Sequence, residues 1–467
     1  MRRQNKHLKT KICPGWAHNS EKGSSLEAEA SFCYNRVIIK LMFKLFVRIQ
    51  LERYVKKYLE RHPAIKLVIV VGSVGKTSAK SAIGTVLKQN FRVRVNEGNH
   101  NAELSAPLAI LGIDYPENLR SIKTWQEIFS IAKERVNKSA DIDVIVQEVG
   151  SDRIGQVPHF GKYARPDIAV VTAVSPEHME YFKTMQAVAD EELSVVKFSQ
   201  QVLINQDDID NKYVESLKAK NIDTYGTTNK AKYHFVKSNF SVKDGFIGKF
   251  MYSDADESID VSLHVMGDHS TRSAVAAGAV GLKLGMKPEE IKSGMRKIRA
   301  VSGRMNVLPG IKQSMIIDDS YNSSPLAASS ALEALYDLDA PQRIAVLGSM
   351  NELGDSSPDE HKSLGGLCDP SKLDWVVTVG SEARKYLAPI AAKQGCNIKS
   401  FEASPEAGEF VKNTLKPSAI VLFKGSEGSI FLEEAIKYVL QNPDDDKKLV
   451  RQSAQWLARK DKFFASK

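Results

Sequence analysis

The feature that most constrains the fold is the stretch VIVVGSVGKTSAKSA, residues 68–82. A run of β-branched residues ends at Val71, a tight turn follows, and a helix-forming segment begins at Lys76. A strand that turns into a helix in this way points backbone N–H groups at an anion held at the helix N-terminus. The sequence therefore predicts a phosphate-binding loop that consists of Gly72, Ser73, Val74, Gly75, Lys76, Thr77 and Ser78.

This predicted loop departs from the general pattern G-x-x-x-x-G-K-[ST] at its first position, where Val70 replaces a glycine. Gly72 can provide the close backbone approach that the missing glycine would give. In such loops the lysine, here Lys76, reaches the β- and γ-phosphates, and the hydroxyl of Thr77 takes a Mg²⁺ position. The loop indicates phosphate binding and leaves the reaction open. A Gly-Lys-Thr turn formed by chance is the alternative.

Short β-branched runs alternate with helical segments along most of the chain, which is typical of an α/β fold with parallel strands. Short alternating strands between about residues 233 and 265 predict an antiparallel flank on the first sheet. A second α/β series begins near Leu308, at the turn LPG. We expect a central P-loop domain with a mostly parallel sheet at residues 64–307, a smaller Rossmann-like α/β domain at 308–441, and a polar, weakly helical tail at 442–467.

The N-terminal segment holds the excess positive charge of the chain. Residues 1–66 carry 15 Lys and Arg against 5 Glu, a net +10, so the rest of the chain contributes −1 to the total of +9. Residues 1–35 are polar and patternless, and we expect disorder there. Residues 36–63 predict an amphipathic helix with basic residues at every fourth position. Through residues 36–61 this helix could lie on an anionic membrane, or it could pack on the next domain with its lysines in solvent.

Composition excludes several classes of protein. The 42% hydrophobic and 26% charged content is that of a globular protein, and the body of the chain lacks the basic surplus of a nucleic-acid enzyme. Four cysteines without C-x-x-C spacing argue against a zinc site or a disulfide framework and fit a reducing cytosol. We expect a cytoplasmic monomer that binds no nucleic acid and lies at the inner membrane face only if the basic helix binds there.

Several ordered motifs resemble the Mur ligase family, the ATP-dependent amide ligases of peptidoglycan precursor synthesis. They span about Ile65 to Leu440 and are most similar to the branch that adds D-alanyl-D-alanine to a UDP-muramoyl tripeptide. The resemblance implies that ATP phosphorylates a substrate carboxylate and that an amine then displaces phosphate to form an amide. The motifs are the shortened loop, GNHNAELSAPLAIL, DDSYNSSPLAASSAL, LGSMNELG followed by His361, and LFKGS.

The resemblance also implies roles for individual residues. Glu148 matches the metal-binding glutamate at a strand end, and His178 matches the histidine near the second Mg²⁺. Arg304 and Lys424 match cations that meet phosphate and substrate. The remaining residues with implied roles are Asp319 for the ribose, Tyr321 and Asn322 beside the adenosine, and Asn99, Asn101 and Glu103 in the asparagine-rich loop for the substrate.

The chain departs from the family pattern in three places. Glu192 stands where the family has a carbamylated lysine, and we hypothesise that it supplies the metal carboxylate directly; a solvated helix acid is the alternative. Ser270 and Ser273 replace two asparagines that contact adenine in the family. Only about 60 residues precede the loop, where the family has a whole UDP-binding domain.

These departures leave three functional readings open. The simplest is the D-alanyl-D-alanine ligase, which uses ATP and Mg²⁺ and acts on a UDP-muramoyl peptide. A related ligase with another, lipid-linked substrate is the close alternative. The third reading is a non-catalytic nucleotide-binding scaffold of cell-wall assembly, which would bind ATP without forming an amide.

Overall fold

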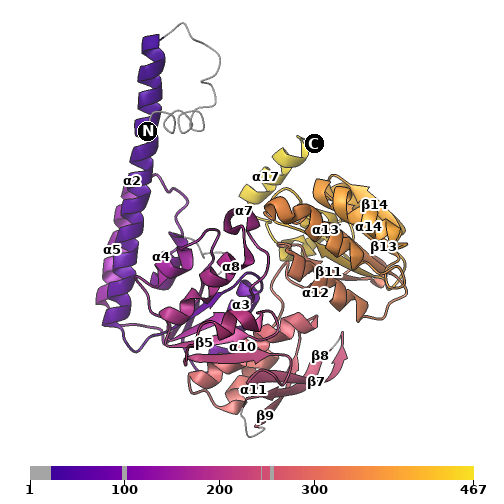
Figure 1. The fold of residues 1–467 in the computed structure, drawn as a ribbon, viewed down its shortest axis with the longest axis horizontal. Coiled ribbons are helices and arrows are strands. Elements are labelled where there is room, and N and C mark those ends of the chain that lie inside the picture. Colours follow the sequence, from indigo (N-terminus) through magenta and orange to yellow (C-terminus); the bar gives the residue numbers. More distant parts are fainter. Residues whose placement is uncertain (1–22, 97–102, 243, 253–256, 467) are drawn as a thin grey trace. The chain divides into compact units, whose positions relative to one another are not determined.

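The computed structural model describes residues 23–96, 103–242, 244–252 and 257–466, with residues 23–39 described in backbone only (Figure 1). Their contacts divide the chain into two units. The larger unit comprises residues 62–102 and 140–467, and the smaller unit comprises residues 1–61 and 103–139.

A large sheet forms the first part of the larger unit. Its nine strands, counted over the described residues, follow the order β2-β3-β1-β4-β5-β6-β7-β8-β9. The neighbours β7–β8 and β8–β9 are antiparallel, and all the other pairs are parallel. The strands are β1 (Lys66–Val71), β2 (Val93–Val95), β3 (Val144–Glu148), β4 (Ile168–Val171), β5 (Gln201–Asn205), β6 (Ile222–Gly226), β7 (Tyr233–Ser241), β8 (Gly245–Met251) and β9 (Ser258–Leu263). The mostly parallel sheet with an antiparallel flank is confirmed.

The burial of these strands explains why the sequence pattern changes along the sheet. In β3 and β4 every residue is buried, as in a parallel strand covered on both faces, whereas β9 alternates exposed and buried residues. Helices α3 (Lys76–Leu87), α10 (Asp268–Lys283) and α11 (Pro288–Arg296) pack together on the first sheet. Their apolar sides join the strands in one core, so that the start of α3 is held rigidly at the carboxyl end of β1.

A second sheet forms the other part of the larger unit. Over the described residues it has six strands in the order β10-β11-β15-β12-β13-β14, parallel except for the β10–β11 pair. The strands are β10 (Asn306–Pro309), β11 (Met315–Asp319), β12 (Arg343–Gly348), β13 (Trp375–Val379), β14 (Ile398–Phe401) and β15 (Ile420–Lys424). The helices are α12 (Pro325–Tyr336), α13 (Ser357–Gly366), α14 (Ala388–Lys393), α15 (Ser404–Thr414) and α16 (Glu433–Ile436).

The segment after this sheet is held by buried charges. It contains the 3₁₀ helix η5 (Pro443–Lys448) and the helix α17 (Ala454–Phe464). The Arg451 guanidinium forms two 2.7 Å hydrogen bonds to the Glu433 carboxylate on α16, and Lys460 Nζ lies 3.2 Å from the same carboxylate. Phe463 packs edge-on against Phe431. The segment predicted to be a polar tail thus contains an anchored helix, because its charged residues form ion pairs inside the protein.

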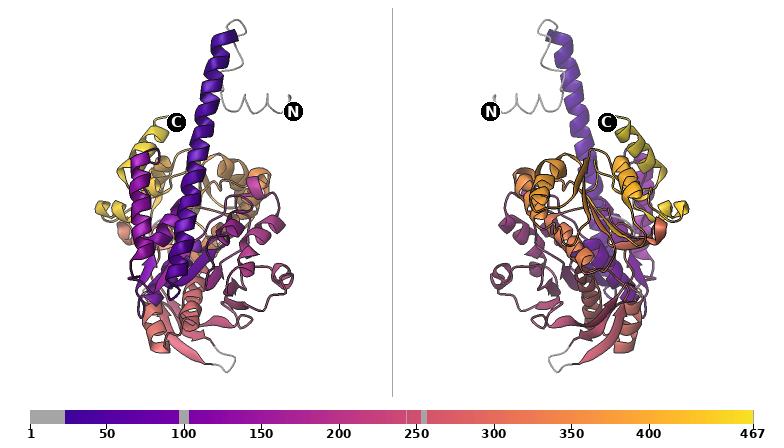
Figure 2. Two further views of the ribbon diagram at one scale, coloured as in Figure 1. Left: turned by 90° about the vertical axis from the view of Figure 1, so that its left-hand side faces the viewer. Right: turned by 90° about the vertical axis from the view of Figure 1, so that its right-hand side faces the viewer.

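The smaller unit is a group of helices. Helix α2 (Gly23–Arg61) is one continuous helix, with α4 (Ser105–Leu111) and α5 (Ile122–Asn137) packed against it (Figure 2). The predicted helix at 36–63 is therefore longer and begins at Gly23, inside the segment expected to be disordered; residues 1–22 lie outside the described residues.

The helices of the smaller unit share an apolar core. Leu51 and Val47 of α2 are buried with Leu108 of α4 and with Trp125 and Ile128 of α5. In the part of the chain that the structure describes, no helix is both long and apolar enough to cross a membrane.

Candidate active site

The phosphate loop depends on two glycines at its ends. Gly72 has φ of 124° and Gly75 has φ of 86°, conformations that L side chains rarely adopt. A Cβ on Gly72 would also lie 2.4 Å from Thr172 Oγ1, closer than real contacts allow. Val70, in contrast, is a fully buried residue of β1 paired with Glu148 and Val170. The residue missing from the general pattern is therefore part of the strand here, and the loop proper starts at Gly72.

Lys76 points into the site and contacts oxygen atoms. Its Nζ donates to the carbonyl of Ser73 at 3.0 Å and lies 3.4 Å from a carboxylate oxygen of Glu177. Burial alone would lower the pKa of Lys76, but the charges of Glu177, Glu192 and Glu148 outweigh it and raise the pKa above its usual value. The lysine is therefore a charged group in a partly dry site, as phosphate binding requires.

The hydroxyl of Thr77 links an acid and an arginine. It donates to Glu148 Oε2 at 3.0 Å and accepts from Arg304 Nη2 at 3.1 Å. The Arg304 guanidinium stacks over the Tyr321 ring, 4.3 Å from its centroid. The sequence predicts that these four residues, Thr77, Glu148, Arg304 and Tyr321, bind phosphate, metal or adenosine. In the structure they lie together.

The oxygen atoms of Thr77 and Glu148 are candidate ligands for a divalent cation. In the described residues, no group of three or more His, Cys, Asp or Glu side chains forms a metal cage. Mg²⁺ in phosphate sites usually keeps water and phosphate ligands and takes only one or two protein oxygens. The hydroxyl of Thr77 and the carboxylate of Glu148 therefore fit such an ion.

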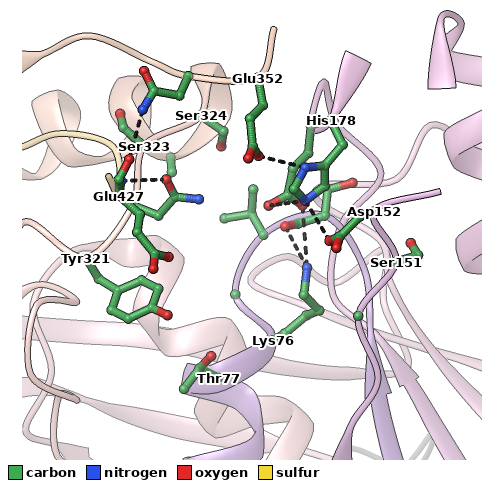
Figure 3. A pocket seen from close by; sticks show the side chains of 18 of the residues that line it. Lys76, Thr77, Ser151, Asp152, His178, Tyr321, Ser323, Ser324, Glu352 and Glu427 are labelled. Carbon is green, nitrogen blue, oxygen red and sulfur yellow. Dashed lines mark hydrogen bonds and ion pairs between the residues drawn. The ribbon is translucent and has the colours of Figure 1, made fainter. Parts of the chain in front are cut away.

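His178 lies beside Glu352 and Asp152 in the wall of a cavity (Figure 3). Its backbone is in the left-handed region, with φ of 50°, which turns the ring toward Glu352. His178 Nδ1 lies 2.7 Å from Glu352 Oε2, and Nε2 lies 3.5 Å from Asp152 Oδ1. Burial would lower the pKa of His178, but the hydrogen bond to Glu352 and the acids around it raise the pKa above 6.5. The contacts of His178 are thus to acids that the sequence analysis did not single out.

Glu192 is buried beneath the phosphate loop. Its carboxylate accepts from the backbone N–H of Gly72 at 2.7 Å and from Ser151 Oγ at 2.9 Å. Burial raises the pKa of Glu192 to about 7, against the opposing effects of Lys76 and of the hydrogen bond from Ser151. Among the contacts of the described residues, none joins Glu192 to His178, the histidine that the family resemblance places near the second Mg²⁺. Lys197, in contrast, is exposed at the end of η1 (Leu193–Lys197).

Asp319 and Lys424 form a buried ion pair of 2.6 Å at the carboxyl ends of β11 and β15. Lys424 Nζ also donates to the carbonyl of Asn322 at 2.8 Å. Both side chains line a small cavity of about 100 Å³ on the other side of the loop, together with Ser270 and Ser273. The two serines that replace family asparagines therefore lie near the acid expected to bind ribose.

A larger cavity, of about 560 Å³, gathers most of the predicted site. Its walls also contain residues for which the sequence predicted no role. Ser323, Ser324 and Glu352 lie inside the quoted motifs without a predicted contact, and Arg459 lies outside every motif. The predicted residues in its lining are Ser73, Val74, Gly75, Lys76, Thr77, Glu148, His178, Arg304, Tyr321, Asn322 and Lys424. The missed residues include Asp152, Glu177, Ser323, Ser324, Glu352, Glu427 and Arg459.

The predicted substrate contacts are Asn99, Asn101 and Glu103. Asn99 and Asn101 fall outside the described residues. Glu103 belongs to the smaller unit, where its carboxylate pairs with Lys44 at 3.2 Å and with Arg48 at 3.3 Å.

A glycine-bounded loop between a parallel strand and a helix, with a second α/β sheet supplying the facing wall, defines a nucleotide-binding enzyme. The chain matches the Mur ligase middle domain over residues 70–281 and the Mur ligase glutamate ligase domain over residues 303–427. The chain belongs to the Mur ligase family, and it is an ATP-dependent amide ligase that forms C–N bonds.

Two of its relatives carry the same name. The UDP-N-acetylmuramoyl-tripeptide–D-alanyl-D-alanine ligase of Bacillus subtilis is 27% identical over 408 residues, which cover 84% of this chain and 79% of the relative. The enzyme of the same name from Borreliella burgdorferi is 24% identical over 381 residues, 81% of this chain and 75% of the relative.

Solved structures show the same fold. A MurF structure from Acinetobacter baumannii has a TM-score of 0.69 at 23% identity and covers 83% of this chain and 79% of that one. MurF from Thermotoga maritima in complex with ADP has a TM-score of 0.69 at 22% identity, over 87% of this chain and 85% of that one.

Proposed function

We propose that this ligase joins D-alanyl-D-alanine to a UDP-muramoyl tripeptide in peptidoglycan precursor synthesis. The observation that carries the proposal is the single cavity in which Lys76, Thr77 and Arg304 face Lys424 from the second sheet. The names of the relatives supply the substrate class. The loop after β1 of the first sheet supplies the groups that bind phosphate. The loops of the second sheet form the wall that faces the other reactant.

The reaction has two displacement steps. A carboxylate oxygen of the tripeptide attacks the γ-phosphorus of ATP, and ADP leaves. The amine nitrogen of the dipeptide then attacks the acyl carbon, inorganic phosphate leaves, and the amine proton goes to solvent. The protein contributes positioning and charge rather than a covalent nucleophile.

Several residues of this chain hold the reacting groups. The backbone N–H groups of residues 72–78 and the Lys76 ammonium bind the β- and γ-phosphates, and Arg304 binds the transferred phosphoryl group. Asp319 and Tyr321 hold the adenosine, and Lys424 faces the substrate carboxylate. Thr77 and Glu148 would hold Mg²⁺, which would neutralise phosphate charge when bound.

Glu192 takes the place of the carbamylated lysine in this proposal. Its burial, and its position beside Lys76 and under Gly72, support a carboxylate that acts at the loop without added CO₂. We expect Glu192→Gln to reduce turnover, measured as phosphate release with Mg²⁺ titrated, whereas Asp190→Asn on the same helix, α8 (Met185–Glu192), should not. Wild-type turnover of Glu192→Gln, or a carbamate found on Lys197, would exclude this role.

The α2 helix supports a finer proposal about location, a cytoplasmic enzyme at the inner membrane face. Five apolar side chains on its outer side, Leu41, Met42, Leu45, Phe46 and Ile49, are 37% to 65% exposed. Lys40 and Lys44 lie beside them, so the helix presents the mixture of apolar and basic groups that anionic lipid attracts. This observation also favours the alternative of a lipid-linked substrate.

Vesicle flotation tests the membrane contact. The chain should float with phosphatidylglycerol vesicles and not with phosphatidylcholine vesicles, and Leu45→Asp with Phe46→Asp should abolish flotation. Ile131→Asp, at an exposed apolar site on α5, is the control. Equal flotation of both variants would exclude α2 as the contact.

Product analysis tests the main proposal. The chain is incubated with Mg²⁺, ATP, D-alanyl-D-alanine and a UDP-muramoyl tripeptide, and both phosphate release and product mass are measured. Phosphate release that requires both substrates, with a product of the expected mass, supports the ligase. Binding of ATP without an amide product would instead indicate the scaffold, and a product only with another acceptor would change the substrate.

A further inference from the structure

The loops of the second sheet form one wall of the large cavity. This wall carries polar groups that the mechanism does not use. Ser323 and Ser324 are 5% and 7% exposed, and both line the cavity. Within the described residues the two hydroxyl oxygens have no hydrogen-bond partner. A buried polar group without a partner costs roughly 1 to 3 kcal/mol, so native proteins usually keep one only where a ligand or water satisfies it. These hydroxyls therefore indicate a polar ligand at this wall.

Two opposite charges line the same cavity. Glu427 follows β15, and Arg459 comes from α17. In the part of the chain that the structure describes, neither side chain forms an ion pair. The other cations of this wall and of the loop have polar partners, because Lys424 pairs with Asp319, Lys76 with Glu177, and Arg304 with Thr77. Arg459 only stacks on Trp456 of its own helix, 4.8 Å from the ring centroid.

The helix that carries Arg459 is held by buried charges, although the Arg459 side chain itself is exposed. Lys460, the next residue, is 2% exposed and pairs with Glu433 and Glu434. Arg451, ahead of α17, is held by Glu433 and by the carbonyls of Ser320 and Tyr321. Burying such charges is costly unless they are fully paired, and full pairing fixes their geometry. The fold thus holds α17 so that one guanidinium reaches the cavity.

We infer that Arg459 is a specificity residue that binds the free carboxylate of the incoming amine substrate. The inference rests on the proposed function, because a dipeptide carries an ammonium or amine at one end and a carboxylate at the other. Glu427 is opposite in charge to the ammonium of the dipeptide, and Arg459 is opposite in charge to its carboxylate. The hydroxyls of Ser323 and Ser324 supply further hydrogen bonds to the dipeptide. A guanidinium binds a carboxylate through two parallel N–H···O bonds, which makes this contact selective.

A phosphate of ATP is a less suitable ligand for Arg459. Lys76, the loop N–H groups and Arg304 already surround the phosphate position on the first sheet. Arg459 instead lines the cavity together with Ser323, Ser324 and Glu427 of the loops that follow β11 and β15. The carboxylate is the anionic group of the amine substrate, and a guanidinium is suited to pair with it.

A steady-state comparison of acid and amide substrates tests the inference. The full chain is assayed with D-alanyl-D-alanine and with its C-terminal amide, at saturating ATP and tripeptide. Wild type should prefer the acid. Arg459→Met should raise the KM for the acid by about 10- to 100-fold with little change in kcat, and should leave the KM for the amide and for ATP unchanged. Arg459→Lys should retain part of the preference, and Lys462→Ala, an exposed cation on the same helix, should behave as wild type.

The outcomes separate the inference from the proposed function. An unchanged acid-to-amide preference in Arg459→Met overturns the inference and leaves the ligase proposal intact. A rise in the KM for ATP instead of the dipeptide also overturns it, because Arg459 would then bind the nucleotide. If wild type forms no amide with D-alanyl-D-alanine, the proposed function fails, and this inference fails with it.

Discussion

At the scale of single residues, the site is organised by groups that hold one another's charge. Lys76 is the centre of this arrangement, because it contacts the loop carbonyls and three acids surround it. The carboxylates of Glu177, Glu192 and Glu148 keep it charged in spite of its burial. Phosphate can therefore meet a full positive charge in a site with little water.

Replacing this lysine should remove catalysis. We expect Lys76→Ala to lower the rate of ATP-dependent phosphate release by at least about 100- to 1000-fold, the usual effect of losing one group that stabilises transition-state charge. Circular dichroism should show an unchanged fold. Lys88→Ala, an exposed lysine at the end of the same helix, is the control. Unimpaired turnover in Lys76→Ala would place the phosphate site elsewhere.

His361 should make the stability of the second sheet depend on pH. The ring is fully buried, Nε2 accepts from the Met350 N–H at 2.9 Å, and Nδ1 faces the Ser357 carbonyl at 2.7 Å. Burial lowers the pKa of His361, while the Ser357 carbonyl and the charge of Glu382 oppose this. The unfolded chain therefore binds a proton below pH 6.5 that the folded chain does not. The free energy of unfolding should fall with acidification by at most about 1.4 kcal/mol per pH unit.

Urea unfolding between pH 5 and pH 7.5 measures this effect. His361→Gln should be less stable at pH 7.5 and should lose part of the pH dependence, because glutamine does not titrate. His234→Gln, a half-buried histidine of the first sheet, serves as the control. A pH dependence identical in wild type and His361→Gln would contradict the prediction.

The sequence predicted the residues of the loop better than those around it. Gly72 and Lys76 belong to one short motif, so their roles follow from spacing alone. Glu352 and Arg459 lie far from that motif in the chain, and only the packing of the second sheet and α17 brings them to the cavity. Glu192 was predicted to supply a metal carboxylate, whereas its contacts are to Gly72 and Ser151, because the helix end that carries it packs under the loop.

At the scale of elements, buried strands were predictable, whereas the anchoring of the weakly helical segment at 442–467 was not. Strands such as β3 are apolar throughout because both faces are covered, and this pattern is visible in the sequence. Helix α17 carries charges that normally indicate solvent. Its stability comes from particular pairs, above all Arg451 with Glu433, which composition does not reveal.

The pairing of Arg451 with Glu433 should therefore be worth more than a surface pair. We expect Arg451→Met to lower the free energy of unfolding by about 3 to 5 kcal/mol, since it leaves a buried carboxylate with fewer partners. Lys448→Ala removes the half-exposed pair with Asp445 and should cost at most about 1 kcal/mol. Limited proteolysis should cut α17 in Arg451→Met first. Equal stability of the two variants would mean that α17 is held mainly by its aromatic contacts.

At the scale of the whole molecule, both sheets of the larger unit supply walls of one cavity. A ligand bound there should stabilise both parts together. We expect Mg²⁺ and ATP at 100 times the dissociation constant to raise the free energy of unfolding by about 2.7 kcal/mol and to raise the melting temperature measured by calorimetry. Lys76→Ala should show no such increase. A shift confined to one of two separate transitions would show that the nucleotide contacts only one sheet.

The ion pairs at the two cavities have a further consequence for competition with small anions. Glu177 on Lys76, Glu352 on His178 and Asp319 on Lys424 act as carboxylates tethered at high local concentration. A single chloride or inorganic phosphate has to displace one of them without compensation. ATP and a peptide carboxylate displace several at once and gain contacts with both walls. Small anions of the cell should therefore inhibit the enzyme only weakly. ATP and the peptide carboxylate should still displace Glu177, Glu352 and Asp319 from their cations.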